Sequence, residues 1–147
     1  MLEPESTRPR LTILLVYEDP PDMIQVEVRV AAGGWAGVAW AYAAPHMLVE
    51  ETSGLLEWLE RPRGEFAIKA FEDTGDGGVT LRWRMADKAG HLACHVRISD
   101  CPHRAWDEMG RLLNEEILTH PAQADRFARH LRSLANRFVG EVSLEGD

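Results

Sequence analysis

Alternation of apolar and polar side chains runs through the first part of the chain and predicts β-strands. In residues 23–31 (MIQVEVRVA), Val recurs at every second position, and Gln, Glu and Arg lie between. This pattern is typical of a strand with one buried and one solvated face. Residues 11–18 are rich in β-forming side chains and end at the turn signal DPPD, and residues 35–42 return as a third strand after AAGG.

The middle of the chain is expected to hold one short helix between strands. We interpret residues 46–50 as a short strand and residues 54–60 (GLLEWLE) as a helix. Thr52 or Ser53 would cap this helix, and Pro62 would end it because proline cannot continue a helix. Alternation then resumes in three predicted strands, at residues 65–71, 79–85 and 91–98.

The last third of the chain is expected to be helical. Two sets of apolar side chains recur there with the helical period, namely Trp106, Met109, Leu113 and Ile117, then Phe127, Leu131, Leu134 and Phe138. Pro121 separates the two predicted helices because proline is favoured in a first helical turn. We interpret residues 141–147 as a polar tail and residues 1–9 as a flexible arm.

These elements predict an α+β fold in a single domain of residues 10–140. Because the strands are grouped and joined by short turns, we expect one antiparallel sheet of about six strands with the short helix inserted. The two C-terminal helices would pack on one face of this sheet. Residues 11–18 are a candidate edge strand, through which two copies could pair into a homodimer.

The charge balance narrows the classes of partner. The chain has 147 residues, with 16 Lys and Arg against 24 Asp and Glu, so its net charge is −8. Binding to nucleic acid or to an anionic membrane needs cationic side chains, so we expect neither partner. No apolar run approaches the roughly 20 residues that span a bilayer, and the first residues lack the apolar segment of a signal peptide. Two cysteines make no disulfide scaffold, and a cytoplasmic protein is expected.

Negative charge concentrates in residues 46–76, where eight carboxylates stand against three cationic side chains. An acidic surface favours a basic protein partner, such as a toxin or a regulator, and speeds association with it. The alternative is an ordinary solvated acidic face. The candidate partner-binding residues are Trp35, Glu50, Glu51, Glu57 and Glu60.

An uncharged aromatic stretch, residues 33–46 (GGWAGVAWAYAAPH), raises a second hypothesis. On a strand, Trp35 faces one way while Trp40 and Tyr42 face the other. We expect the Trp40 and Tyr42 face to be core, and Trp35 to be the contact with a partner or ligand. A small-molecule pocket, or an unrecognised active site, would then lie between sheet and helices. Its candidate lining is Trp40, Tyr42, Trp83 and Trp106.

The best candidate metal ligands are His91, His95, Cys101 and His103, because zinc prefers such nitrogen and sulfur donors. However, His91 and His95 would lie roughly 13 Å apart on an extended strand, so a bulge would be needed. The alternative is a polar strand face with two exposed histidines, and we expect no bound metal. We interpret Cys94, on the inward face, as a small core residue.

Catalytic chemistry finds little support in the motifs. Cys101 could act as a nucleophile with His103 as its base, since a helix N-terminus lowers a thiol pKa. The alternative is that Ser99 or Asp100 caps a helix that begins at Pro102. The sequence contains no GxSxG, HExxH, paired CxxC or dinucleotide-binding motif, so no cofactor is expected.

The block from GLLEWLE to HLACHVRI resembles a group of small uncharacterised bacterial α+β domains. Those domains are similar to immunity proteins that are encoded beside bacterial toxins and act by binding. The resemblance covers roughly residues 45–98 and implies no particular functional residue. It implies a non-enzymatic interaction protein of the immunity or regulatory type. The matching positions are Gly54, Leu55, Trp58, Phe66, Gly78, Val79, Leu81 and Trp83.

Overall fold

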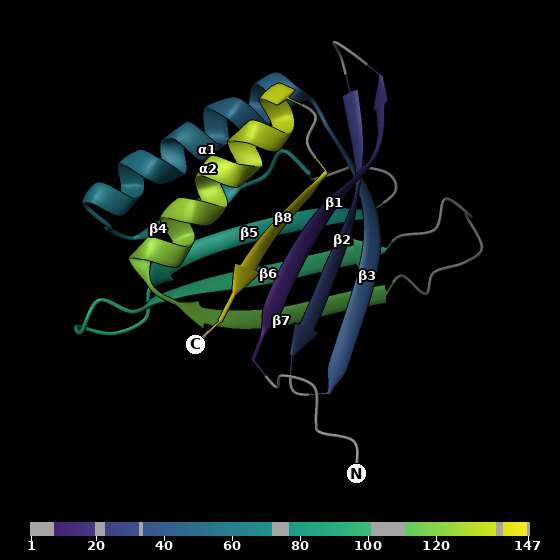
Figure 1. Ribbon diagram of the computed structural model, residues 1–147. Coiled ribbons are helices and arrows are strands. Elements are labelled where there is room, and N and C mark those ends of the chain that lie inside the picture. The colour runs from purple at the N-terminus through teal and green to yellow at the C-terminus, as the bar shows by residue number, and fades with distance from the viewer. Residues whose placement is uncertain are drawn as a thin grey trace.

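Two antiparallel sheets of four strands and a pair of helices make up the protein (Figure 1). The computed structural model describes residues 8–19, 23–32, 34–71, 77–100, 111–137 and 140–146. The first sheet has the strand order β3-β2-β1-β8, formed by β1 (Arg10–Asp19), β2 (Met23–Ala32), β3 (Trp35–Ala43) and β8 (Glu141–Glu145). The second has the order β4-β5-β6-β7, formed by β4 (Glu65–Ile68), β5 (Gly77–Met85), β6 (Leu92–Asp100) and β7 (Arg111–Thr119).

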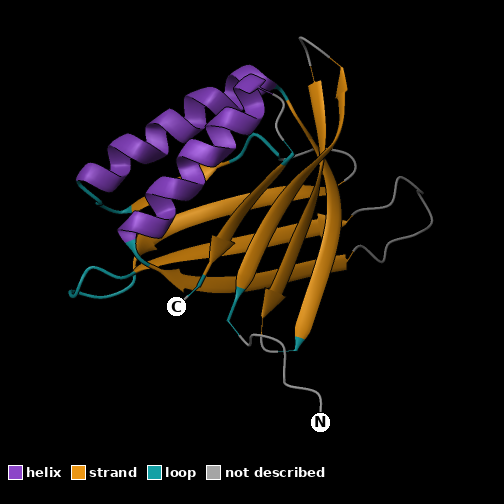
Figure 2. Cartoon of the chain, in the orientation of Figure 1, coloured by secondary structure: helices purple, strands orange, loops and turns teal. Residues whose placement is uncertain are grey.

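The helices α1 (Pro45–Glu60) and α2 (Pro121–Arg137) lie side by side (Figure 2), with α2 against β8 of the first sheet and α1 against β4 of the second. The strands of the first sheet cross those of the second, so the two sheets and the helices enclose a single cluster of buried apolar side chains. The ring of Trp83 on β5 lies 5.8 Å, centroid to centroid, from that of Phe127 on α2. This aromatic contact joins the second sheet to the helical layer.

Five predicted strands and the last predicted helix are confirmed; the strands are those at residues 11–18, 23–31, 35–42, 79–85 and 91–98. Three of these elements show a clear apolar face. Along β2, the buried positions are every second residue from Ile24 to Val30. On β1, Leu11 and Ile13 are buried in the same manner. Helix α2 places its predicted apolar stripe in the core, with the buried residues Phe127, Leu131 and Leu134.

The α+β class and the antiparallel pairing are confirmed, but the single six-stranded sheet with two C-terminal helices is wrong. Residues 111–119 form the strand β7, which pairs with β6, where a helix was predicted. Leu113 and Ile117 are four residues apart, and this spacing places them on one side of a strand as well as of a helix. Trp106, Met109 and Phe138 lie outside the described residues.

The predicted polar tail is also wrong, since residues 141–145 form β8. Val142 and Leu144 alternate with the polar residues Glu141, Ser143 and Glu145, and both are buried where β8 pairs with β1. Two apolar positions are too few to indicate a strand in the sequence. Because β1 lies between β2 and β8, it is an interior strand over Arg10 to Leu14, and not the edge strand that was expected.

Helix α1 begins nine residues earlier than predicted, at Pro45, and replaces the expected short strand at residues 46–50. Proline at the first helical position suits this start. Leu48, Thr52 and Leu55 recur at the helical period and are fully buried. Thr52 therefore does not cap the helix, because its hydroxyl donates a 2.7 Å hydrogen bond to the Leu48 carbonyl inside it.

Candidate interaction surface on helix α1

The exposed side of α1 carries a group of carboxylates that the rest of the described chain does not neutralise. Because Leu48 and Leu55 point inward, Glu50, Glu57 and Glu60 are left on the solvent side. None of these three forms an ion pair with a residue that the structure describes. Helix α1 contains four glutamates and neither Lys nor Arg, so it presents a concentrated negative charge.

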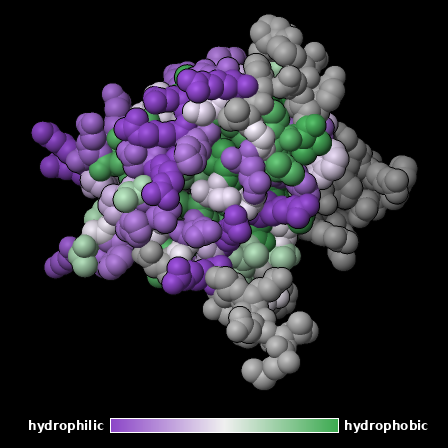
Figure 3. Space-filling model, viewed as in Figure 1, coloured by the Kyte–Doolittle hydropathy of each residue, from purple (hydrophilic) through white to green (hydrophobic). Residues whose placement is uncertain are grey.

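A shallow groove of about 740 Å³ follows this side of α1. Both carboxylates and apolar side chains line it, and the surface over the two helices is largely hydrophilic (Figure 3). From α1 it is lined by Met47, Glu50, Glu51, Ser53, Gly54, Leu56 and Glu57, and from β4 and α2 by Phe66, Ala67 and Arg132. The groove therefore offers apolar contact area within an acidic rim.

Gly54 sets how closely β4 approaches the helix. A Cβ at this position would lie 2.9 Å from Cζ of Phe66, closer than real Cβ contacts come. The absence of a side chain lets the half-buried Phe66 ring rest against the backbone of α1. Phe66 thereby becomes part of the groove wall.

Glu51 differs from the other glutamates because its carboxylate is already bound. It accepts hydrogen bonds from the backbone N–H of Lys69, at 3.1 and 3.2 Å, and from that of Ala70, at 2.8 Å. These bonds tie α1 to the residues that follow β4. Glu51 thus holds the groove in shape, and its carboxylate is less available to a partner than those of Glu50 and Glu57.

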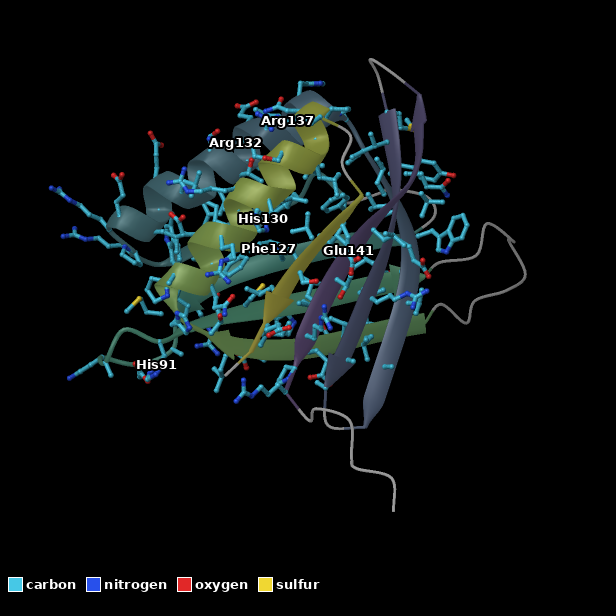
Figure 4. All side chains as sticks on the ribbon, in the orientation of Figure 1. His91, Phe127, His130, Arg132, Arg137 and Glu141 are labelled. Carbon is cyan, nitrogen blue, oxygen red and sulfur yellow. The ribbon has the colours of Figure 1, made fainter. Side chains whose placement is uncertain are left out.

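Helix α2 brings the opposite charge to the neighbouring surface. It carries four arginines against Asp125. Arg129 donates to Asp125 at 2.7 Å, and this hydrogen bond raises the pKa of Arg129. Arg132, labelled in Figure 4, reaches the edge of the groove. It makes no hydrogen bond or ion pair with any residue in the described ranges, so a cationic side chain borders the groove without a direct contact to its carboxylates.

The structure does not bring together the aromatic residues of the expected pocket. Trp83 is fully buried beneath α2, whereas Trp40 and Tyr42 are 58% and 43% exposed on the outer face of the first sheet. Trp106 lies outside the described residues. The expectation that the Trp40 and Tyr42 face is core is therefore wrong.

The small face of β3 is the buried one. Ala39, Ala41 and Ala43 are almost inaccessible, and Gly37 lies against Leu113 of β7. Both faces of this strand are apolar, so the sequence carries no sign of which one points inward. Trp35 is the first residue of β3 and pairs with Ala32 of the neighbouring strand β2. Its side chain lies outside the described part of the structure.

The two described histidines of the candidate metal group have other partners. Nδ1 of His91 lies 2.7 Å from the Asp87 carboxylate, and Nε2 of His95 lies 3.0 Å from Oδ1 of Asn114. Cys101 and His103 lie outside the described residues. Among the residues that were placed, no group of three or more His, Cys, Asp or Glu side chains could hold a metal ion.

Cys94 lies on the inward face of β6, as expected, and is fully buried. Burial raises the pKa of its thiol, and the charge of Glu116 adds to this effect. Because the thiolate is the nucleophilic form, this cysteine is unreactive at neutral pH.

The sequence-based reasoning missed Met47, Phe66 and Arg132 as groove residues. Met47 could have been found if residues 45–60 had been interpreted as one helix, since helical spacing places it on one side with Glu50, Glu51 and Gly54. Phe66 and Arg132 come from other elements, and no local pattern connects them to α1.

No protein-family model, curated protein or solved structure matches this chain. No helix in the described part of the chain is long and apolar enough to cross a membrane.

Proposed function

We propose that this protein is a non-enzymatic interaction protein that binds a basic protein partner through the acidic side of α1. The observation that carries the proposal is the set of exposed carboxylates of Glu50, Glu57 and Glu60, which form no ion pair with a described residue. Two of them, Glu50 and Glu57, line a groove of about 740 Å³. Uncompensated charge on one helix face is costly to the isolated fold and favourable to a partner of opposite charge.

The groove adds apolar contact area, which the charges on α1 alone do not provide. Exposed ion pairs contribute little affinity, because water and salt screen them. Met47, Leu56 and Phe66 supply apolar surface within the same groove, and burial of such area contributes roughly 25 cal/mol per Å². A partner that places a cationic side chain against Glu50 or Glu57 and an apolar one against Phe66 would use both effects.

The partner class follows from charge and from the resemblance to bacterial immunity domains. A basic toxin, or a basic regulator, fits a protein of net charge −8 whose α1 lacks Lys and Arg. The region of resemblance, residues 45–98, includes the whole exposed side of α1. In this proposal α1 binds the partner and blocks its action, and no chemical step is required.

The test is capture of the partner by the full chain. We would co-express the protein with the product of the reading frame beside its gene and measure the Kd of the complex. A triple variant with Glu50→Gln, Glu57→Gln and Glu60→Gln should weaken binding at least tenfold. Raising the salt concentration should weaken the wild-type complex and affect the variant less, since screening acts on the charges that the variant lacks.

The control is a double variant, Glu65→Gln with Glu141→Gln, which removes two exposed carboxylates from β4 and β8 and is compared with the double variant Glu50→Gln with Glu57→Gln. It lowers the negative charge but leaves α1 intact, and it should bind within about twofold of wild type. If both variants lost the same affinity for the partner, binding would depend on the overall charge of the protein and not on the carboxylates of α1. A complex that tolerates the triple variant would contradict the proposal.

A further inference from the structure

The outer face of the first sheet ends in an exposed apolar row on β3. Val38, Trp40 and Tyr42 are 53%, 58% and 43% exposed, and they occupy successive outward positions of the strand. On the neighbouring strand β2 the outward positions opposite them are polar, namely Arg29, Glu27 and Gln25. The apolar row is therefore confined to β3.

The same strand is an edge of its sheet. β3 pairs with β2 on one side, and no described strand pairs with its other side. An edge strand presents unpaired backbone N–H and C=O groups, which can pair with another chain. Proteins usually protect such edges by shortness or by charged side chains.

The other edges in the described part of the chain have this protection, and β3 does not. β4 has four residues and begins with Glu65, and β8 has five residues and carries Glu141 and Glu145. β7 has nine residues but carries Glu115 and Glu116 at its centre. β3 has nine residues, WAGVAWAYA, with no charge and no proline.

The lack of charge on β3 favours a second copy of this chain as the occupant. A strand from a different partner could be selected by charge, but β3 offers no charge to select it. Two copies of β3 neither repel one another nor leave a charge to be desolvated when they pair. An antiparallel pair of identical strands is also compatible with two-fold symmetry, which is the commonest arrangement of homodimers.

The side chains of β3 define one register in which all nine residues pair. Only registers that bring outward positions opposite outward positions keep Val38, Trp40 and Tyr42 on one face. Pairing centred on Ala39 overlaps both strands fully, and it places Trp40 opposite Val38 of the other copy and Tyr42 opposite Ala36. Pairs of an aromatic with a β-branched side chain stabilise antiparallel sheets.

We propose that two copies of this protein form a homodimer through antiparallel pairing of their β3 strands, centred on Ala39, which joins the two first sheets into one. The dimer goes beyond the proposed function, because it uses the opposite part of the fold from the acidic side of α1. It would present two acidic surfaces to partners, so that a partner with two sites would be held by both.

The experiment measures the mass of the full chain in solution by analytical ultracentrifugation, up to about 100 μM, well above a micromolar Kd. Wild type should show twice the monomer mass of 16.5 kDa. Val38→Lys and Trp40→Glu should each weaken dimerisation at least tenfold, since each places two like charges diagonally across the pair. Leu118→Lys is the matched control, because Leu118 is 51% exposed on the edge strand β7 of the other sheet, and it should remain dimeric.

The register is tested by mixing the two weakened variants. The ammonium introduced at position 38 of one chain then faces the carboxylate introduced at position 40 of the other, so an equimolar mixture should dimerise more strongly than either variant alone. Far-UV circular dichroism confirms that both variants fold, as expected for substitutions at exposed positions. A monomeric wild type, or dimers that both variants leave unchanged, would overturn the proposal. If each variant weakens dimerisation but the equimolar mixture does not dimerise more strongly than either variant alone, the register centred on Ala39 is wrong.

Discussion

A Cβ on Gly37 of β3 would overlap Cδ2 of Leu113 of β7, so the end of the Leu113 side chain would have to shift to admit it. This approach brings the inward face of β3 onto the second sheet, in keeping with the glycine and alanines at its inward positions from 37 to 43. Side chains larger than alanine would hold the two sheets apart, because sheets with full side chains pack about 10 Å apart. The same contact turns Trp40 and Tyr42 outward.

Replacement of Gly37 by alanine should therefore destabilise the fold by about 1 kcal/mol, the lower end of the usual cost of overpacking, because the overlapping atom ends the flexible Leu113 side chain. Urea unfolding measures this change. Gly140→Ala is the control, because an added Cβ there meets no atom within 4 Å, and it should stay within about 0.5 kcal/mol of wild type. If the contact with Leu113 causes the loss, the double variant Gly37→Ala with Leu113→Ala should be more stable than the sum of the single effects predicts.

Trp83 should tolerate phenylalanine far better than alanine. Its ring is fully buried against Phe127, so Trp83→Ala should cost about 3–5 kcal/mol in guanidinium unfolding. Its indole Nε1 has no hydrogen-bond partner among the described residues, and a buried unpaired donor is itself unfavourable. Trp83→Phe removes that donor and keeps most of the ring. If Trp83→Phe lowered the free energy of unfolding as much as Trp83→Ala does, Nε1 of Trp83 would have a hydrogen-bond partner.

Glu51 should matter for stability. Glu51→Ala removes the acceptor of the Lys69 and Ala70 amides and should cost about 1.5–3 kcal/mol, as is usual for hydrogen bonds to a charged group. Glu51→Gln keeps one acceptor oxygen and should fall between wild type and the alanine variant. Thermal unfolding measures the series. Glu50→Ala, at the exposed neighbouring position, serves as the reference and should change stability by less than about 0.5 kcal/mol.

The carboxyl group of Asp87 should titrate at a pH below the ordinary pKa of an aspartate. The side-chain hydrogen bond from His91 lowers the pKa of Asp87 from 3.8, and the backbone N–H groups of His91 and Ala89 act in the same direction. A carboxyl pKa that is lower in the folded protein stabilises the fold above the unfolded value of about 3.9, and this contribution disappears as the pH falls through the folded pKa. The carboxyl carbon resonance in an NMR titration should show a midpoint below 3.8.

In His91→Ala the Asp87 midpoint should move up toward 3.8, but not fully, because the two backbone bonds remain. His95→Ala is the control, since His95 contacts Asn114 and not Asp87. An unchanged Asp87 midpoint in His91→Ala would mean that the backbone amides alone set its pKa.

The acidic surface was predictable in part. Its negative charge is visible in residues 46–60, and Glu50 and Glu57 were identified from it. The role of Glu51 could not be predicted, because its partners are the backbone amides of residues 69 and 70, which lie far from it in the sequence. The groove was not predictable either, since Phe66 and Arg132 reach it from β4 and α2.

Elements whose two faces differ in polarity follow from the amino-acid sequence alone. In β2 and α2 the apolar positions follow a single period, so burial of the apolar face is the only arrangement that removes those side chains from water. The remaining elements depend on packing between distant parts of the chain. β3 is apolar on both faces, Leu113 and Ile117 fit a strand and a helix equally, and Val142 and Leu144 are too few to indicate a strand. In each case the outcome depends on contacts with residues far away in the sequence, and local periodicity carries no information about those contacts.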